Sequence, residues 1–409
     1  MPFAGAGMPS RRGAIGCLLV LLTACASSPR SSAPAESRSP APSAEAPAPA
    51  VEEEPAAPAP RRVTIGGAGD VLVHTKVALA AEQRGGFAHV FGELREVIGE
   101  DEIAFVNLET PLSLRVTPEG TGELPVLGAS PAVAPALAAV GFDVASLANN
   151  HAYDQTARGL EETLAALAEA SVSAIGAAST AEEAPGPVVI ERDGVRVAFV
   201  AFTERLNRGP ILRAHAAYVA RFDPTRAEAA LALARSRADV VVASIHWGHD
   251  FQVEPLAAHR ALARRLVEQG ADVILGHGPH VLHEVERLSS PRGEAVCAYS
   301  LGNLVSNQGA RYRAGGRTPP DLNPAAALAE SRDAVWLRAR VVLEGERLRI
   351  DALEAVPLWT HNNRDAAIMG REPVDIRVRP LRSIEDEAIR EERRPIIART
   401  LGEAVVLVD

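Results

Sequence analysis

Five short polar clusters, each following an apolar run, constrain the fold of this chain more than any other feature. They are Gly69-Asp70, Asn107-Leu108-Glu109, Asn149-Asn150-His151, His246-Trp247-Gly248 and Gly276-His277-Gly278-Pro279-His280. Each preceding run is short and apolar, as in a buried strand. In sheets covered by helices, ligands gather at the carboxyl ends of the strands. The pattern therefore predicts one site assembled from distant parts of a single domain.

The segments between these clusters predict alternating strands and helices. Helices are expected over residues 74–83, 87–98, 131–140, 157–169, 224–237 and 257–269. Antiparallel hairpins are expected over residues 188–202 and 336–356, and residues 281–300 fit a third. An alternating pattern joined to hairpins predicts an α/β fold of two mixed sheets packed together, with helices outside.

The first 25 residues have the pattern of a bacterial export signal. Arg11 and Arg12 precede a short apolar stretch that ends at Leu22-Thr23-Ala24-Cys25. This motif resembles the lipobox of bacterial lipoproteins, and the resemblance implies a lipid on Cys25. We expect an exported protein that is lipid-anchored to the cell envelope, at the outer membrane or periplasmic face if the host is Gram-negative. An ordinary signal peptide that happens to contain Cys is the alternative.

The composition divides the rest of the chain into three parts. Residues 26–60 are Pro-, Ala-, Ser- and Glu-rich and contain no aromatic residue, which predicts a disordered tether. Residues 61–360 are expected to form the folded domain and residues 361–409 a C-terminal extension. Of the three cysteines, Cys297 alone falls in the folded part, so no intramolecular disulfide is expected there.

The charge and aromatic content limit the partners. The formal net charge is −10 and aromatic residues make up 4% of the chain, which argues against nucleic acid. An anionic partner needs local cations, and two predicted loops supply them. Arg205 and Arg208 lie in the first loop, and Arg311 and Arg313 in the second. We predict that they bind a carboxylate polymer or phosphate; solvated loops are the alternative.

The polar clusters carry the donor atoms of a divalent metal centre. The predicted ligands are Asp70, Glu109, Asn150, His246, His277 and His280. Carboxylate, amide and imidazole donors suit one or two ions such as Mn, Fe or Zn. His151 is predicted as a general acid or oxyanion stabiliser, and Asp154 as the group that fixes its tautomer. The alternatives are a turn at Asp70, a helix cap at residues 149–151 and satisfied core histidines.

In this order, the motifs resemble the CapA-type family associated with bacterial capsule and poly-γ-glutamate synthesis, a branch of the calcineurin-like metallophosphoesterase superfamily. The resemblance covers residues 63–357 and includes Ser300-Leu301-Gly302-Asn303. It implies a four-layer α/β/β/α sandwich with its site at one edge of the sheets. It also implies acidic ligands at Asp70 and Glu109, an Asn150 ligand beside a catalytic His151, and later His ligands. We add Asn303 to the predicted substrate-binding residues.

The sequence thus predicts a CapA-type envelope lipoprotein that acts on an anionic polymer such as poly-γ-glutamate. Metal-dependent hydrolysis or transfer at an amide or phosphoester would be its chemistry, with capsule-synthesis or export proteins as partners. One alternative is a non-catalytic module that binds polymer or partner at a degenerate site. Another is a secreted metallophosphoesterase, although Leu72 stands where the phosphoesterase Asp-x-His pattern has His.

Overall fold

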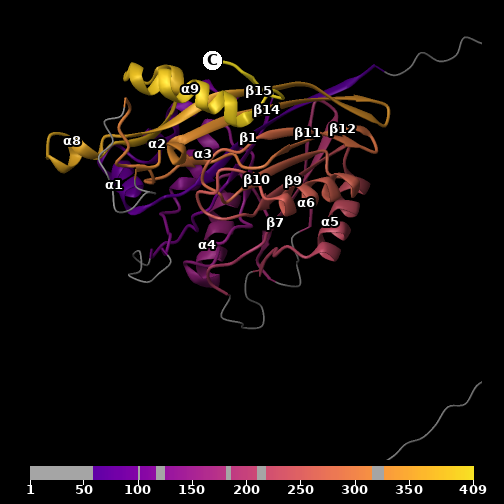
Figure 1. Ribbon diagram of the computed structural model, residues 1–409. Helices are drawn as coiled ribbons and strands as arrows, with labels where there is room; N and C mark the ends of the chain where they lie inside the picture. Colours follow the sequence, from indigo (N-terminus) through magenta and orange to yellow (C-terminus); the bar gives the residue numbers. More distant parts are fainter. Residues whose placement is uncertain (1–58, 100–101, 117–124, 181–185, 210–217, 316–326) are drawn as a thin grey trace, which may run out of the picture. The chain divides into compact units, whose positions relative to one another are not determined.

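The computed structural model describes residues 59–99, 102–116, 125–180, 186–209, 218–315 and 327–409 (Figure 1). They form a compact unit assigned to residues 57–409. The predicted export signal, Cys25 and nearly all of the predicted tether lie outside these ranges. Among the residues that are described, no helix has the length and apolar character needed to cross a bilayer.

The helices agree with those expected from the sequence, except that the helix expected over residues 87–98 is α-helical only to Phe91 and then continues as a 3-10 turn. Helix α5 (Pro224–Arg237) begins where predicted, because Pro224 fits the first helical position and the Asp223 side chain accepts a hydrogen bond from Arg226 N at 3.0 Å. The other helices are α1 (Thr75–Gln83), α2 (Phe87–Phe91), α3 (Val133–Val140), α4 (Thr156–Glu169), α6 (Ala257–Glu268), α8 (Arg364–Ile368) and α9 (Glu387–Leu401), with 3-10 turns η1 (Gly92–Glu96), η2 (Ala329–Arg332) and η3 (Leu381–Ser383).

The strands include all three predicted hairpins, β6–β7, β11–β12 and β14–β15. Cys297, on β12, is a buried free thiol. The strands are β1 (Arg61–Val71), β2 (Glu102–Asn107), β3 (Val144–Ser146), β4 (Ser173–Ile175), β5 (Ala177–Ala178), β6 (Val188–Arg192), β7 (Val195–Thr203), β8 (Tyr218–Val219), β9 (Val240–His246), β10 (Val273–His277), β11 (Val285–Ser290), β12 (Gly293–Ala298), β13 (Asn303–Val305), β14 (Asp333–Glu344), β15 (Arg347–Asn362), β16 (Ile376–Pro380) and β17 (Val406–Leu407).

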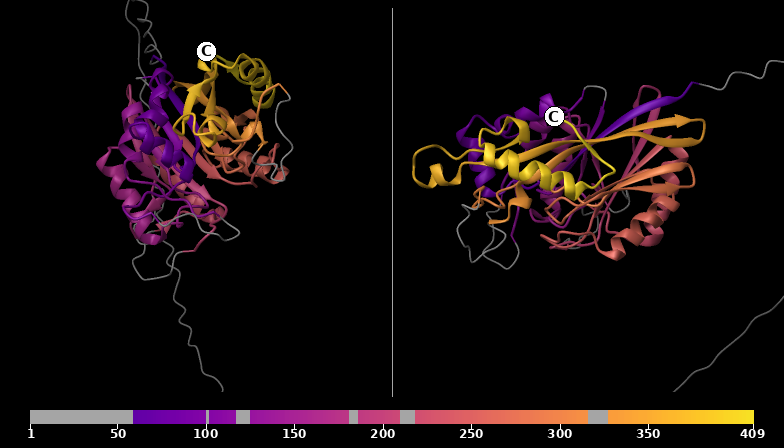
Figure 2. Two further views of the ribbon diagram at one scale, coloured as in Figure 1. Left: turned by 90° about the vertical axis from the view of Figure 1, so that its left-hand side faces the viewer. Right: turned by 45° about the horizontal axis from the view of Figure 1, so that its top comes forward.

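The main sheet follows the path β4-β3-β2-β1-β14-β15-β12-β10-β9-β7-β6 and folds back on itself as two facing halves (Figure 2). We call the part from β4 to β15 the first half and the part from β12 to β6 the second half. The register gives one residue pair between them, Gly293 with Leu348. Phe105 of the first half stacks on Phe199 of the second, with ring centroids 6.3 Å apart. The prediction of packed mixed sheets is confirmed, with the addition that their hydrogen-bonded path is continuous.

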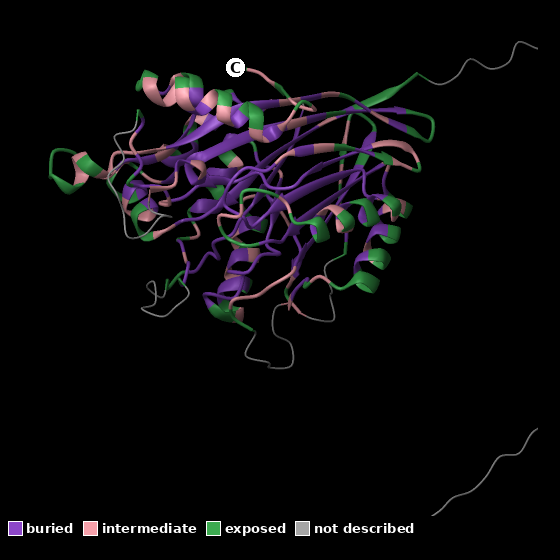
Figure 3. Cartoon of the chain, in the orientation of Figure 1, coloured by how far each residue is buried: buried purple, intermediate pink, exposed green. Residues whose placement is uncertain are grey.

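Strand β9 shows why the runs that precede the polar clusters are apolar at every position. Val240 and Val242 pack into the core between the halves, whereas Val241 and Ala243 belong to a second core shared with α5 and α6. A strand covered on both faces needs apolar residues at every position. Figure 3 shows these strands buried and the outer faces of α5 and α6 exposed. The period of two also places His246 on the inward face, at the strand end.

Residues 361–409, predicted as an extension, supply β16, β17 and α9 to the same compact unit. Strand β16 pairs with the end of β15, so the predicted boundary at residue 360 falls inside an antiparallel pair. Arg393 of α9 is 2% exposed, and its guanidinium donates to both carboxylate oxygens of Asp333 at 3.2 and 2.6 Å. These contacts fasten α9 to the start of β14.

Candidate metal centre

Strand register brings the polar clusters together. Asp70 pairs with Asn107 across the parallel strands β1 and β2, and His246 pairs with His277 across β9 and β10. In each half, the parallel strands carry these residues at their carboxyl ends. Because the halves face each other, the two pairs of residues meet at one edge of the core, where ligand sites form in such sheets.

Asp70 is fully buried at the middle of this group. Its Oδ1 accepts a hydrogen bond from Asn107 Nδ2 at 2.9 Å and lies 3.3 Å from His277 Nδ1. Its Oδ2 lies 3.1 Å from His280 Nδ1 and accepts from Gly278 N at 3.3 Å. His280 adopts a left-handed backbone (φ 60°), a conformation that is costly for a residue other than glycine and is found most often at functional sites.

Glu109 is also fully buried, and neither of its carboxylate oxygens has a hydrogen-bond partner among the described residues. His246 Nε2 lies 3.7 Å from Oε1, and His280 Nδ1 lies 3.8 Å from Oε2. Asp70, Glu109 and His246 each offer one ligand atom, and these atoms lie within 4.8 Å of one another. This is the donor set and spacing of a divalent cation site.

Burial and mutual contacts shift the pKa values of the ionisable groups in this centre. Burial, with the charge of Asp70, raises the pKa of Glu109 well above its usual range. Burial lowers the pKa of His246 to about 3, against the attraction of Asp70. Burial would also raise the pKa of Asp70, but contacts with His277 and His280 keep it well below its usual value. His280 is buried too, yet Glu109 and Asp70 raise its pKa to about 10.

Several further residues of the polar clusters also carry buried, unpaired atoms. Within the described ranges, Asn107 Oδ1, Asn150 Oδ1 and His277 Nε2 have no hydrogen-bond partner. Buried polar atoms are nearly always paired in native proteins, so a concentration of exceptions needs an explanation. Oxygen and imidazole nitrogen are both good ligands for Mn, Fe or Zn. The residues present therefore fit the predicted divalent metal.

His151 and Asp154 form a hydrogen-bonded pair beside the candidate metal centre. His151 Nδ1 lies 2.6 Å from Asp154 Oδ2, and that oxygen also accepts from Leu127 N at 2.7 Å. Asn207 Nδ2 lies 3.4 Å from His151 Nε2. With the carboxylate holding a proton on Nδ1, Nε2 is left as the nitrogen that can exchange a proton. The charge of His151 also lowers the pKa of His246, so the two groups are close enough to interact.

The loop that carries Asn150 is tied to the loop after β2. Asn149 Nδ2 donates to Leu108 O at 2.9 Å, and Asn207 N donates to Asn150 O at 2.8 Å. These bonds bring Asn150 to the neighbourhood of Glu109. That the Asn150 side chain is a ligand stays a prediction.

Two of the predicted substrate-binding arginines lie beside the centre. Arg205 donates to Gly248 O and lies 2.9 Å from His249 Nδ1, in the loop that follows His246. Arg208 is exposed, and its Nε lies 3.7 Å from Asp154 Oδ1. Both arginines therefore lie next to residues of the candidate centre; that they bind an anion stays a prediction.

The other predicted substrate-binding residues are Arg311, Arg313 and Asn303. Arg313 Nε donates to Asp365 Oδ2 at 2.6 Å, on α8, and Arg311 is exposed on the same loop. Asn303 Nδ2 has three protein acceptors, namely Ser306 Oγ, Gln308 Oε1 and Ser331 O. The Asn303 Oδ1 is buried with no hydrogen-bond partner among the described residues, and residue 303 pairs with Asp70 across β13 and β1. That Asn303 binds substrate stays a prediction.

Sequence reasoning did not identify Asn107 as a site residue, and it did not identify Glu204, which contacts the turn after His246. Asn107 contacts Asp70 and lies 3.5 Å from His246 Nδ1; its place at the end of a buried strand was the available signal. Glu204 Oε2 accepts from Gly248 N at 3.3 Å and lies 3.6 Å from His259 Nε2. These contacts fix the turn after His246, and no sequence motif predicts them.

Comparison with known proteins points to one family. Residues 64–308 match the family described as "Bacterial capsule synthesis protein PGA_cap". The "PGA biosynthesis protein CapA" of Bacillus subtilis (strain 168) is 28% identical over 242 residues, which are 59% of this chain and 62% of that protein. The "Capsule biosynthesis protein CapA" of Bacillus anthracis is 34% identical over 173 residues, 41% of each chain. The chain thus spans about two fifths to three fifths of these relatives.

Among solved structures, the calcineurin-like phosphoesterase YfkN of Bacillus subtilis is similar with a TM-score of 0.40. The identity is 11%, and the match covers 73% of this chain and 91% of that chain.

Proposed function

The chain belongs to the bacterial capsule synthesis protein PGA_cap family, and from that premise we propose that it acts in the synthesis, attachment or release of an anionic capsule polymer such as poly-γ-glutamate. The convergence of Asp70, Glu109 and His246 on one buried point carries this proposal. Two CapA relatives named for capsule or PGA biosynthesis support the choice of polymer.

The proposed chemistry is metal-dependent hydrolysis or transfer at an amide or phosphoester bond. Asp70, Glu109 and His246 would hold the ion, with His277, His280 and Asn150 as the remaining predicted ligands. A divalent ion bound there supplies Lewis acidity and lowers the pKa of water. The buried, unpaired Glu109 carboxylate provides the negative charge that retains the ion.

The residues around the centre would position the substrate and move a proton. Asp154 holds His151 through Nδ1, so that Nε2 can deliver a proton to the leaving group. Arg205 and Arg208 would attract carboxylates of the polymer, because both lie beside the centre in a chain whose net charge is −10. The ion pair between Arg208 and Asp154 would then couple substrate binding to the orientation of His151.

The proposed setting is the cell envelope. The N-terminal pattern that ends in Leu22-Thr23-Ala24-Cys25 would direct export and lipid attachment. A lipid on Cys25 would tether the domain close to the enzymes that make or export the polymer. Radiolabelled palmitate should enter the wild-type chain in a bacterial host and fail to enter Cys25→Ser.

Metal content and turnover measured together test the proposed function. The purified protein should contain stoichiometric Mn, Fe or Zn and should cleave γ-glutamyl peptides or phosphoesters. His246→Ala/His277→Ala should lose both properties, whereas His89→Ala, on α2, should keep them. A metal-free protein that still binds polymer would favour the non-catalytic module. Turnover of aryl phosphates alone would favour a secreted phosphoesterase.

A further inference from the structure

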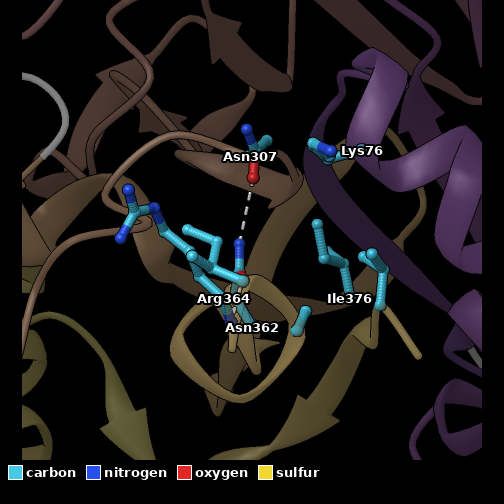
Figure 4. Close-up of a pocket in the computed structure, with 8 residues that line it drawn as sticks. Lys76, Asn307, Asn362, Arg364 and Ile376 are labelled. Carbon is cyan, nitrogen blue, oxygen red and sulfur yellow. Dashed lines mark hydrogen bonds between the residues drawn. The ribbon is translucent and has the colours of Figure 1, made fainter. Parts of the chain in front are cut away.

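A cavity of about 370 Å³ lies between α1, α8 and the strand ends of β13, β15 and β16 (Figure 4). No part of the proposed mechanism uses it. It combines two cations, two amides and an apolar wall. The residues that line it are Lys76, Asn307, Asn362, Arg364, Ala367, Ile368, Val374 and Ile376.

Lys76 is the only lysine in the chain, because every other residue among the 42 Lys and Arg is arginine. It lies in the first turn of α1, and within the part of the chain that the structure describes its ammonium group has no ion-pair partner. In Figure 4 it enters the cavity from α1 on one side, while Arg364 lies on the other. An unpaired cation at the wall of a cavity is a ready partner for an anion.

The charge of Arg364 is only partly balanced. Its Nη1 lies 3.4 Å from Asp365 Oδ1, but the same carboxylate receives Arg313 through Oδ2 at 2.6 Å and a second close contact. The hydrogen bond from Arg313 lowers the pKa of Asp365, so this acid is ionised and shared between two arginines. The cavity lining itself therefore contributes two cations, Lys76 and Arg364, and no acidic residue among those described.

The rest of the lining specifies what kind of anion would fit. Asn362 Nδ2 donates to Asn307 Oδ1 at 3.1 Å, which leaves the Asn307 amide nitrogen as a further donor. Ile368 and Ile376 are among the apolar residues of the lining, and Figure 4 shows Ile376 on the same side of the cavity as Lys76. A carboxylate on an aliphatic backbone matches this combination, since its oxygens suit the cations and its methylene groups suit the wall. Inorganic phosphate has no methylene groups and would use only the polar part of the lining.

Two residues that line the cavity, Lys76 and Asn307, are only a few positions along the sequence from residues at the candidate metal centre. Lys76 follows Asp70 by six residues, a separation that an extended chain spans in at most about 21 Å. On the other side, Asp70 pairs with Asn303 and Val71 with Val305, just before Asn307. One extended polymer could therefore reach both places.

We propose that the cavity around Lys76 and Arg364 is a second binding site for the carboxylates of an anionic polymer, and that it holds the polymer chain while the metal centre acts on another part of it. This inference rests on the proposed function for the identity of the polymer. Lys76 and Arg364 bind the carboxylates, and the apolar wall packs against the methylene groups between them.

The single lysine allows a direct test on the full chain. An amine-reactive acetylating reagent modifies the Lys76 side chain and the α-amino group, and peptide mass spectrometry distinguishes the two. Oligo-γ-glutamate at ten times its Kd should slow acetylation of Lys76 by about 10-fold, by mass action. Neutral polyglutamine should give no protection. Protection by inorganic phosphate or by anionic phospholipid vesicles, without protection by oligo-γ-glutamate, would overturn the proposal.

Variants separate binding in the cavity from binding elsewhere. Lys76→Gln and Arg364→Gln should each weaken binding of fluorescent oligo-γ-glutamate by about 3- to 5-fold, the range of a partly exposed charge pair. Arg349→Gln, at the opposite end of β15, is the matched control and should leave affinity unchanged. If Lys76→Gln and Arg364→Gln bound oligo-γ-glutamate as tightly as the control Arg349→Gln, with unchanged melting temperatures, the proposal would be overturned.

The outcome is distinguishable from failure of the proposed function. In Glu109→Gln, which should lose the metal, oligo-γ-glutamate should still protect Lys76. Protection without turnover would retain the cavity site and remove the catalytic proposal. Turnover by the wild-type protein without protection of Lys76 would retain the catalytic proposal and remove the cavity site.

Discussion

His280 Nδ1 lies 3.1 Å from Asp70 Oδ2 although 210 residues separate the two along the chain. The contact crosses from the loop after β10 to β1, which belong to different halves of the sheet. The candidate metal centre therefore depends on how the halves pack. Substitutions at the packing surface should affect it as well as substitutions of ligands.

Divalent metal should stabilise the protein through Glu109. At a hundred times its Kd, Mn²⁺ or Zn²⁺ should add about 2.7 kcal/mol to the free energy of unfolding. Glu109→Gln should abolish most of this gain, because it removes the buried carboxylate charge. Without metal the variant should be as stable as wild type or more stable, since the burial of that carboxylate is relieved. Calorimetry with and without metal measures both effects, with the exposed Glu346→Gln as control.

Asp154→Asn should lower turnover without removing the metal. The carboxylate fixes the proton on His151 Nδ1, and an amide does not favour the same tautomer. If His151 acts as the general acid, kcat on the γ-glutamyl or phosphoester substrate should fall about 100-fold. Metal content and KM should stay close to wild type. An unchanged kcat would show that His151 moves no proton in the rate-limiting step.

Gly69→Ala should destabilise the fold next to Asp70. A Cβ at residue 69 would lie 2.0 Å from Gly302 O, far inside contact distance, so β1 and the loop before β13 would have to separate. We expect a loss of about 1–3 kcal/mol in unfolding free energy. Gly92→Ala is the control, because nothing lies within 4 Å of the position that a Cβ would take there and the φ of Gly92 is −58°. Equal losses in the two variants would contradict the steric explanation.

Asp239 should make the stability depend on pH in acid. Burial would raise its pKa, but hydrogen bonds from Arg61 at 3.2 Å and from Arg196 N at 2.9 Å lower it below the usual value. A lowered native pKa gives stability that is present above the unfolded pKa of about 3.9 and lost as the pH falls through the native pKa.

Asp239→Asn should therefore cost about 1 kcal/mol at pH 7, and the difference from wild type should shrink below pH 4. Denaturant titrations between pH 3 and pH 7 measure the difference. Asp193→Asn, in an exposed turn, should leave the pH dependence unchanged. A constant difference across this range would mean that the effect of Asp239 is not electrostatic.

The sequence was most informative where local pattern decides structure. Pro224 predicts the start of α5 because proline is tolerated at the first helical position, and Asp193-Gly194 predicts the turn of the β6–β7 hairpin. The clusters at residues 70, 109, 246, 277 and 280 were visible because parallel strands place their ends at a common edge. These features need no knowledge of distant contacts.

What the sequence could not show depends on pairing across the fold. Asn107 becomes important through its register with Asp70, and Asn303 lies beside the same aspartate because β13 pairs with β1. Lys76 and Arg364 share a cavity although 288 positions separate them, so no local pattern connects them. The predicted boundary at residue 360 fell inside a strand pair because a charged, weakly patterned segment does not reveal its β-partner.

The two halves of the sheet contribute different chemistry to the centre. Residues 70–109 bring the carboxylates, and residues 246–280 bring the imidazoles. A partly synthesised chain that ends before residue 246 therefore has oxygen donors but no nitrogen donor from this set. If this set binds an ion, as proposed, the ion can be captured only after residues 246–280 have been added, and it would then oppose separation of the two halves of the sheet. Loading with metal would thus report that the whole domain has finished folding.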